Sequence, residues 1–361
     1  MVFQRYFRNP ETTANLRDIY AASFVVGNSA NGDTLQNSHF LDAQGVLDAV
    51  AAVAALPSGN GEIYVRAGIY DFAGLGGIVV PDAVTIRGSL GATVFATDTV
   101  YPFISNAADT FMVLGNIAIA PQGVPTAGTS IIEVGGDCRV FNIPVILDDL
   151  AAVGTLLRAW HIAGTSAISF METLPILNGA GLAAIDGMLI EGANAELYAS
   201  VIFGISGDSI VIAASSLVIS DLNLLGGCSR GIYLQSGSHN NIAGVRVEGS
   251  ISHGFEIEDT HGNFLTACHA TSCGGDGFRT AGNRGSISNC HSNGNTGNGI
   301  TALAASNNNV FSANVVHTNG GDGGNDVGTS NIWTSSQLSG NTGASLDTTG
   351  ATTPEIGHNI T

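Results

Sequence analysis

The sequence predicts an all-β fold, a parallel β-solenoid with about 22–23 residues per coil, on three observations. The first is a set of glycines, each followed by an apolar residue, that recur at intervals of 23, 23 and 22: Gly231, Gly254, Gly277 and Gly299. The second is a set of apolar residues behind polar ones, mostly Asn, at intervals of 22, 23 and 23: Ile242, Phe264, Ile287 and Val310. The third is the composition, 44% hydrophobic and 11% charged, which excludes a disordered chain. Helix-pair repeats have longer periods of about 33 to 47 residues, so this period fits one turn of a solenoid.

Stacking follows from the repeat. One coil cannot bury its apolar side chains alone, so successive coils must lie on one another, about 4.8 Å apart, with like residues above like. Asparagines recur near one turn and are expected to form hydrogen-bonded ladders with a structural role: Asn240, Asn241, Asn263, Asn308 and Asn309.

Residues 1–40 differ from the rest. The first twenty residues hold three of the eleven arginines and four aromatic residues. Two interpretations stay open: an N-terminal arm that attaches the protein to a larger assembly, or a poorly ordered terminus.

The solenoid is expected over residues 41–340 and begins with a helix. Residues 41–56 are rich in Ala and Leu and stop at Pro57, as a buried helix of about four turns would. This helix is expected to cap the first coil, whose unpaired N–H and C=O groups would otherwise form an aggregation-prone edge. Residues 341–361 lose the apolar pattern and are expected to form a Gly/Thr/Ser-rich tail.

The segment after the helix carries a family resemblance. A Gly59-Asn60-Gly61 turn leads into the alternating pattern of residues 63–70, then Val80-Pro81 and the segment 84–88, Val-Thr-Ile-Arg-Gly. This opening resembles that of pectin-lyase-like β-helices, most of all those of bacteriophage tailspikes and related viral surface proteins. The resemblance implies a single-stranded, right-handed parallel β-helix over roughly residues 41–340 and brings no catalytic motif with it.

The same resemblance implies a function. It is that of a bacteriophage structural protein: a homotrimeric spike on the virion surface that contacts other virion proteins through residues 1–40 and binds host surface polysaccharide. Whether such a spike also hydrolyses the polysaccharide stays open at this point. Two alternatives remain, a non-enzymatic virion decoration protein and a secreted, extracellular polysaccharide lyase or epimerase.

Charge and composition exclude several other classes. The net charge is −18 and all basic residues are Arg, so the chain lacks the basic cluster that nucleic-acid binding requires. No apolar run approaches the roughly 20 residues that span a membrane, and no cofactor is expected. The five cysteines lack metal-site spacing, and Cys268 and Cys290, one repeat apart, are expected to stack as buried thiols.

The repeat phase predicts an outward-facing stack. We call the four recurring glycines, Gly231, Gly254, Gly277 and Gly299, the landmark glycines. In the strand after each of them the first apolar residue points inward, so the next points outward. The predicted outward stack is Tyr233, Glu256, Arg279 and Thr301. Glu258 lies two residues beyond Glu256 on the same face, with Cα atoms about 6.6 Å apart.

Two carboxyl groups on one face point to glycoside hydrolysis. That reaction uses carboxyls about 5–5.5 Å apart for retention or about 6.5–9.5 Å apart for inversion. Glu256 and Glu258 are therefore the candidate catalytic pair, with Tyr233, Arg279 and Asp259 as candidate substrate-binding residues. The other interpretation is a solvated face with a cross-strand Glu–Arg pair worth about 0.2–1 kcal/mol, and it is favoured because glutamate is common on such faces.

Metal chemistry is the weaker alternative. A lyase would use Arg279 as base and Glu256 and Asp276 to hold Ca²⁺, but the sequence shows no compact cluster of the six to eight oxygens that Ca²⁺ takes. His269 and His291 lie one repeat apart and are expected to stack on neighbouring coils. No third ligand is evident beside them, so neutral surface histidines are favoured over a metal site.

Overall fold

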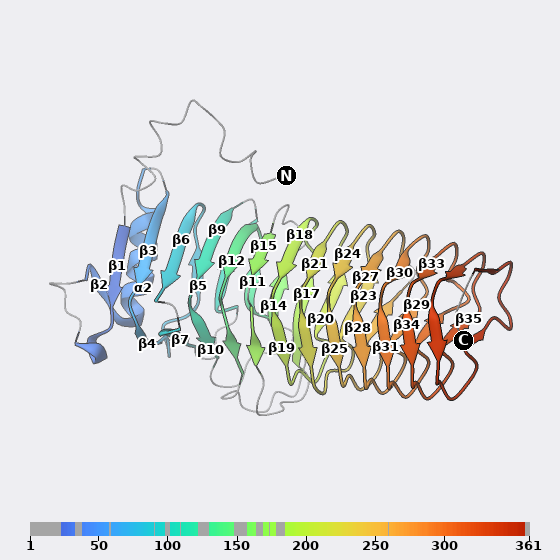
Figure 1. The fold of residues 1–361 in the computed structure, drawn as a ribbon. Coiled ribbons are helices and arrows are strands. Elements are labelled where there is room, and N and C mark those ends of the chain that lie inside the picture. Colours follow the sequence, from blue (N-terminus) through green and yellow to red (C-terminus); the bar gives the residue numbers. More distant parts are fainter. Residues whose placement is uncertain are drawn as a thin grey trace.

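The chain is a right-handed parallel β-helix, seen in a computed structural model that describes residues 23–32, 38–57, 59–89, 91–97, 102–108, 110–121, 130–147, 157–163, 169–172, 174–177, 185–258 and 260–357. Its strands follow one another along a single axis, from β1 at the N-terminal end to β38 and β39 at the other (Figure 1). Three parallel sheets run along this axis, of 15, 12 and 12 strands. The predicted fold class is confirmed.

Sheet A has 15 strands and includes both ends of the described chain. In spatial order they are β2 (Phe40–Leu41), β1 (Ser23–Gly27), β3 (Gly61–Val65), β6 (Val84–Gly88), β9 (Phe111–Gly115), β12 (Asp137–Phe141), β15 (Ser169–Glu172), β18 (Ala195–Tyr198), β21 (Val218–Ser220), β24 (Asn241–Ala243), β27 (Phe264–Thr266), β30 (Ser286–Ser288), β33 (Val310–Ser312), β36 (Ile332–Thr334) and β39 (Glu355–Ile356).

Sheet B has 12 strands, one per coil. They are β4 (Gly68–Asp71), β7 (Thr93–Ala96), β10 (Ala118–Ala120), β13 (Val145–Ile146), β16 (Ile176–Leu177), β19 (Val201–Phe203), β22 (Asn223–Leu225), β25 (Arg246–Glu248), β28 (His269–Thr271), β31 (His291–Asn293), β34 (Val315–His317) and β37 (Gln337–Ser339).

Sheet C also has 12 strands and follows sheet B in each coil. They are β5 (Ile78–Val80), β8 (Ile104–Asn106), β11 (Ser130–Val134), β14 (Leu157–Ile162), β17 (Ile185–Ile190), β20 (Ile210–Ala213), β23 (Ile232–Ser236), β26 (Phe255–Ile257), β29 (Phe278–Thr280), β32 (Ile300–Ala302), β35 (Gly324–Asp326) and β38 (Leu346–Asp347).

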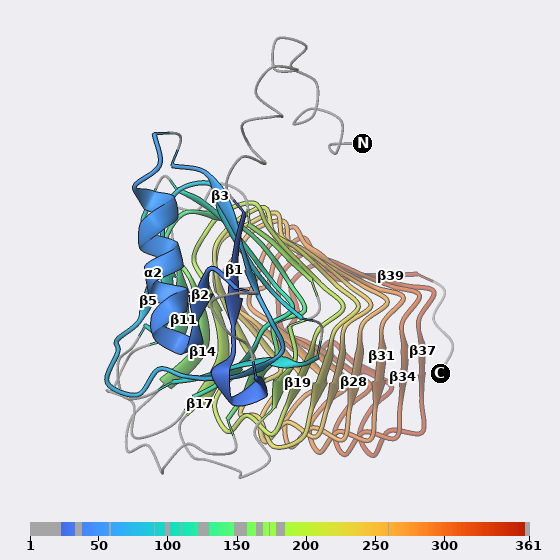
Figure 2. The same cartoon turned by 90° about the vertical axis from the view of Figure 1, so that its left-hand side faces the viewer.

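One α-helix, α2 (Asp42–Ala54), lies at the N-terminal end, close to the predicted 41–56 (Figure 2). It buries one face against β1 to β4. The buried residues are Ala43, Gly45, Val46, Ala49, Val50 and Val53. A short 3₁₀ helix, η2 (Ser29–Asn31), precedes it, and the Asp42 carboxylate accepts hydrogen bonds from the Ser29 amide at 2.8 Å and hydroxyl at 2.9 Å. Neither described helix is long and apolar enough to span a membrane.

The solenoid extends beyond the predicted range of 41–340 at both ends. β1 lies within the segment predicted as an arm, yet it pairs in parallel with β3, Val25 opposite Tyr64. At the other end β38 and β39 fall within the predicted tail and pair with β35 and β36. Residues 1–22, which carry the arginines of the predicted arm, lie outside the described residues.

The landmark glycines lie directly before strands of sheet C, where neighbouring coils approach closely. A Cβ on Gly277 would lie 2.8 Å from the carbonyl oxygen of Gly299, and one on Gly299 would lie 2.6 Å from that of Gly323. Such distances leave no room for a side chain, and the glycine period follows from this restriction.

The interior is filled by stacked like residues, as the repeat predicts. The rings of Phe255 and Phe278 stack 4.8 Å apart, and those of Phe311 and Trp333 stack 4.3 Å apart. The Cys268 amide donates to the sulfur of Cys290 at 3.4 Å, so the predicted stack of buried thiols is confirmed.

Buried asparagine ladders join the coils at their turns. The Asn240 amide donates to the side-chain oxygen of Asn263 at 3.0 Å, and the Asn309 amide donates to that of Asn331 at 2.9 Å. The predicted ladder is therefore confirmed for Asn240, Asn263 and Asn309. A second ladder, through Asn295, Asn319 and Asn341, was not predicted.

Candidate functional site

The predicted outward stack exists on sheet C. Tyr233 pairs with Glu256, Glu256 with Arg279, and Arg279 with Thr301 on successive strands β23, β26, β29 and β32. We call this line of side chains the outer row. It is less solvated than expected, because Glu256 is 8% exposed and Thr301 is 7% exposed.

A second line of polar side chains, which the repeat phase did not predict, lies beside the outer row. Each member stands two positions before the inward-facing residue that is aligned from strand to strand in sheet C. We call this line the polar row. Its members are Ser130, Arg158, Asp186, Asp208, Arg230, His253, Asp276, Asn298 and Asp322. The signal was present in the sequence, since Arg230, His253, Asp276 and Asn298 each directly precede a landmark glycine. The glycines were used only to find the repeat period, and the polar residues before them were not aligned.

Backbone hydrogen bonds hold the polar row in place. The amide of Asn298 donates to Asp276 Oδ1 at 2.8 Å, and the amide of Asp322 donates to Asn298 Oδ1 at 2.7 Å. The amide of Asp208 donates to Asp186 Oδ1 at 2.9 Å in the same way. Each of these side chains therefore accepts an amide hydrogen from the next coil and has a fixed orientation.

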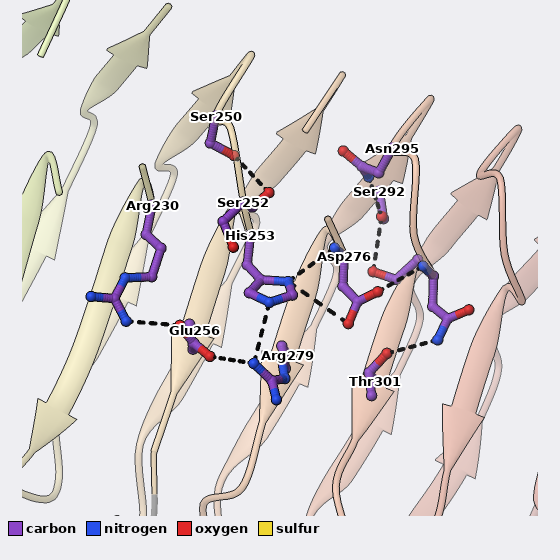
Figure 3. Close-up of polar contacts among 12 residues, drawn as sticks. Arg230, Ser250, Ser252, His253, Glu256, Asp276, Arg279, Ser292, Asn295 and Thr301 are labelled. Carbon is purple, nitrogen blue, oxygen red and sulfur yellow. Dashed lines mark hydrogen bonds and ion pairs between the residues drawn. The ribbon is translucent and has the colours of Figure 1, made fainter. Parts of the chain in front are cut away.

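Glu256 binds two arginines from neighbouring coils (Figure 3). Its Oε2 accepts from Arg230 Nη1 at 3.0 Å, and its Oε1 accepts from Arg279 Nη1 at 2.6 Å. Arg230 also makes a two-pronged contact with Asp208, at 2.9 Å and 2.6 Å. Burial opposes the charge of Arg230, but its hydrogen bonds to Asp208 and Glu256 outweigh that effect and raise the pKa of the guanidinium.

His253 lies between two hydrogen-bond donors (Figure 3). Its Nδ1 accepts the amide hydrogen of Asp276 at 3.0 Å, so the neutral ring carries its own hydrogen on Nε2. Nε2 lies 3.2 Å from Arg279 Nη1, which is also a donor. Burial lowers the pKa of His253, against the opposing effect of the Asp276 and Glu256 carboxylates. Two donors thus meet at the surface of sheet C, and an oxygen atom from a ligand would satisfy both.

Tyr233, a predicted substrate-binding residue, already contacts two charged side chains of this face. The Arg230 guanidinium carbon lies 3.4 Å from the centroid of its ring, so a cation already covers one face. Its hydroxyl donates to Glu258 Oε1 at 3.3 Å. Burial raises the pKa of Tyr233, and the charge of Glu258 adds to this effect.

The two predicted catalytic carboxyls have different partners. Glu256 is engaged through both oxygens by arginines, whereas Glu258 lies beyond the end of β26 and contacts Tyr233. A carboxylate held in this way positions cations and would have to break an ion pair to exchange a proton with a substrate. Asp259 lies outside the described residues, and the other four predicted site residues lie together on this face.

The polar row continues into the irregular coils toward the N-terminus. Ser130, Arg158 and Asp186 occupy matching positions on β11, β14 and β17. Arg158 Nε lies 3.9 Å from Asp186 Oδ2, and burial raises the pKa of Asp186. Among the described residues, the buried atoms Ser130 Oγ and Arg158 Nε have no hydrogen-bond partner. From β11 to β35 the row crosses eight coil steps, roughly 38 Å at about 4.8 Å per step.

The residues assigned to Ca²⁺ in the lyase alternative have other partners. Glu256 binds arginines, and Asp276 Oδ2 lies 3.8 Å from His253 Nδ1. Within the described part of the chain, no three His, Cys, Asp or Glu side chains are grouped to hold a metal ion.

Comparison with known proteins supports the fold. Residues 187–360 match the model of a family described as "Right handed beta helix region". No curated protein matches the chain. Among solved structures it is similar to the catalytic domain of GH87 alpha-1,3-glucanase in complex with nigerose, at 10% identity and a TM-score of 0.63 over 87% of this chain and 66% of that one. It is also similar to a variant of the periplasmic alginate epimerase AlgG, at 10% identity and a TM-score of 0.52 over 98% of this chain and 89% of that one.

At 10% identity, these comparisons show a shared fold. The chain spans slightly less than two thirds of the glucanase catalytic domain. Both neighbours are named as enzymes of polysaccharides, and neither is named as a tailspike or another viral protein. The findings support the predicted resemblance to pectin-lyase-like β-helices: the chain has the right-handed β-helix fold that polysaccharide-acting enzymes also use.

Proposed function

We propose that the protein binds a polysaccharide along the outer face of sheet C. The observation that carries this proposal is the pair of converging donors, His253 Nε2 and Arg279 Nη1, 3.2 Å apart. Arg279 Nη1 already donates one hydrogen to Glu256, but no acceptor lies between its second hydrogen and that of His253 Nε2 in the described residues, and a sugar hydroxyl or ring oxygen supplies one.

The geometry of the solenoid suits a polymer. Polar side chains recur on successive coils of sheet C, so a linear chain of sugars that runs parallel to the axis meets a polar group at each step. Ser130, Arg158 and Asp186 occupy matching positions and extend this line of polar residues toward the N-terminal coils.

Charge favours a neutral polysaccharide. The face carries the carboxylates of Asp186, Asp208, Glu256, Glu258 and Asp276 against the guanidinium groups of Arg158, Arg230 and Arg279. The acids outnumber the arginines, and the whole chain has a net charge of −18. A polyanionic sugar would therefore be repelled, whereas a neutral one would not.

The biological setting that we propose is a viral surface spike, homotrimeric, attached through its N-terminal arm and presenting sheet C to host polysaccharide. It rests on the sequence resemblance. The alternatives are a virion decoration protein without sugar binding and an extracellular lyase or epimerase. If the protein is also an enzyme, we propose that it hydrolyses the polysaccharide with Glu256 and Glu258. The ion pairs of Glu256 favour binding without hydrolysis.

The test is calorimetric titration of the purified protein with a panel of neutral and acidic surface polysaccharides. Arg279→Ala is expected to weaken binding at least tenfold, because it removes one of the two donors. Arg246→Ala, which removes an exposed arginine that pairs with Glu248 on sheet B, is the matched control and should bind as the parent does. Equal affinity of Arg279→Ala and the parent, or no binding to any polysaccharide, would contradict the proposal.

Release of reducing ends tests the proposed hydrolysis. If hydrolysis occurs and survives replacement of both Glu256 and Glu258 by Gln, the predicted carboxyl pair is wrong. Products with the ultraviolet absorbance of unsaturated uronates would instead support the lyase alternative.

A further inference from the structure

Sheet B carries a line of three histidines on neighbouring coils. His269 on β28 pairs directly with His291 on β31, which confirms the predicted stacking of these two residues. His317 on β34 lies diagonally above His291, because its partner in the register is Asn293. Ring centroids are 5.5 Å apart for the first pair and 4.9 Å apart for the second.

We propose that His291 and His317 form a binding site for a divalent transition-metal ion, of the class represented by Ni²⁺ and Cu²⁺. Their Nε2 atoms lie 2.8 Å apart on the outer face of the solenoid. Imidazole is a preferred ligand of both ions. This site is separate from the face of sheet C and does not depend on the proposed polysaccharide binding.

The distance between the two nitrogens fits cis coordination. Metal–imidazole bonds are about 2.0–2.1 Å long, so two ligands at a right angle have nitrogens roughly 2.9 Å apart. Ligands at a tetrahedral angle have nitrogens roughly 3.3 Å apart. The observed 2.8 Å is close to the right-angle value, which tetragonal and octahedral ions adopt, and short for tetrahedral Zn²⁺.

Hydrogen bonds orient the two rings. His291 Nε2 faces His317 Nε2 at 2.8 Å. The Nδ1 of His317 is 3.0 Å from the Thr318 hydroxyl. When that Nδ1 carries the hydrogen and donates it, the lone pair of Nε2 accepts the hydrogen of His291 Nε2. Metal binding then requires only that His291 move its hydrogen from Nε2 to Nδ1, with no net release of a proton.

The backbone holds both residues at a fixed separation. The His291 amide donates to the carbonyl of Cys268 at 2.8 Å, and β31 and β34 are paired through consecutive residues. Such a site needs little reorganisation on binding. The nearest charged residues on this face in the register are Arg246, which pairs with His269, and Glu248; they bind each other at 2.6 Å. In the described residues no third ligating side chain converges with the pair, so water completes the coordination shell.

The experiment is calorimetric titration of the full chain with NiCl₂ at pH 7.5, together with the electron paramagnetic resonance spectrum of the Cu²⁺ complex. We expect one tight equivalent of Ni²⁺ and a Cu²⁺ spectrum with two nitrogen ligands. His291→Asn and His317→Asn should each weaken binding at least tenfold, whereas His269→Asn should change it less than twofold. His261→Asn, at an exposed histidine elsewhere on the chain, is the matched control and should leave binding unchanged.

Circular dichroism of each variant shows whether it keeps the parent fold, so that loss of binding is assigned to the ligand. Two outcomes would overturn the proposal. One is Ni²⁺ binding by His291→Asn and His317→Asn that equals binding by the parent; the other is a folded parent protein that binds no Ni²⁺ at millimolar concentration.

Discussion

Arg279 reaches from one coil to Glu256 on the preceding coil and donates a hydrogen bond of 2.6 Å, while Arg230 donates to the same carboxylate from the other side. The Glu256 side chain is 10% exposed, so the carboxylate depends on these two cations for its solvation. The three residues therefore join three coils of sheet C by charge as well as by backbone hydrogen bonds.

Replacing Glu256 by Gln should lower the free energy of unfolding by about 2 kcal/mol, because two partly buried guanidinium groups lose their counter-charge. The value is modest because the Arg279 side chain is 35% exposed and water screens part of the interaction. Urea unfolding followed by circular dichroism measures the change. Arg246→Ala breaks an exposed pair on sheet B and should cost under about 1 kcal/mol. Equal effects of the two substitutions would show that Glu256 is not a structural centre of this face.

The buried carboxylate of Asp326 supports the second prediction. It is 1% exposed and accepts hydrogen bonds of 2.9 Å from the Trp333 indole, the Asn331 amide group and the Gly328 backbone. Asp326→Ala removes the acceptor of three buried hydrogen bonds and should cost at least about 3 kcal/mol.

Two measurements check the Asp326 prediction. The thermal midpoint should fall, and fluorescence should shift to the red as water reaches Trp333, one of two tryptophans in the chain. Asp347→Ala, at a half-buried residue on the next coil whose carboxylate accepts the exposed Thr349 amide, is the control and should change both measurements far less. An unchanged midpoint for Asp326→Ala would refute the assigned role.

The sequence predicted the fold and part of the site for one physical reason. Coils must superimpose, so spacing alone predicts which residues lie above one another; the outer row from Tyr233 to Thr301 was predicted in this way. Spacing does not predict where a long side chain reaches. Arg230 packs over Tyr233 and binds Glu256. The predicted catalytic carboxyl of Glu256 therefore also takes part in ion pairs that spacing did not predict.

Two other features were not predicted from the sequence, for different reasons. The Ser130, Arg158 and Asp186 segment of the polar row comes from coils that are longer than the regular repeat, where the glycine period does not align the residues. His317 was missed because it lies diagonally across the register from His291, and not one repeat away from it.

The landmark glycines give a steric prediction. Gly277→Ala places a methyl group 2.8 Å from the carbonyl oxygen of Gly299 and against the hydroxyl of Ser292, so neighbouring coils must separate. We expect a loss of more than about 3 kcal/mol, within the range of the largest single-residue effects. Gly294→Ala, whose φ is +67° but whose Cβ would meet no atom closer than 4.0 Å, should cost about 1 kcal/mol. A smaller loss for Gly277→Ala than for Gly294→Ala would show that coil spacing does not select glycine.

The last prediction concerns pH and His253. Burial lowers the pKa of this ring in the folded chain below the unfolded value of about 6.5. The unfolded state therefore binds more protons between the two values, and the stability that neutral His253 contributes above pH 6.5 is lost as the pH falls through this window. Thermal midpoints measured from pH 7.5 down to pH 5 should decline more steeply for the parent than for His253→Asn.

Asparagine is the matched replacement because Asn298, two coils further along the polar row, accepts the amide of Asp322 with its side-chain oxygen. An asparagine at position 253 can accept the amide of Asp276 in the same way, so the hydrogen bond is kept and the titration is removed. The pKa of His291 is also lowered in the folded chain, so this residue contributes to the same decline in stability. Thermal midpoints of His291→Asn measure its contribution separately. If His253→Asn and the parent lose stability in parallel over this range, His253 is not the group that responds to pH. A flatter profile for the variant would show that protonation of His253 destabilises the folded chain, as its lowered pKa predicts.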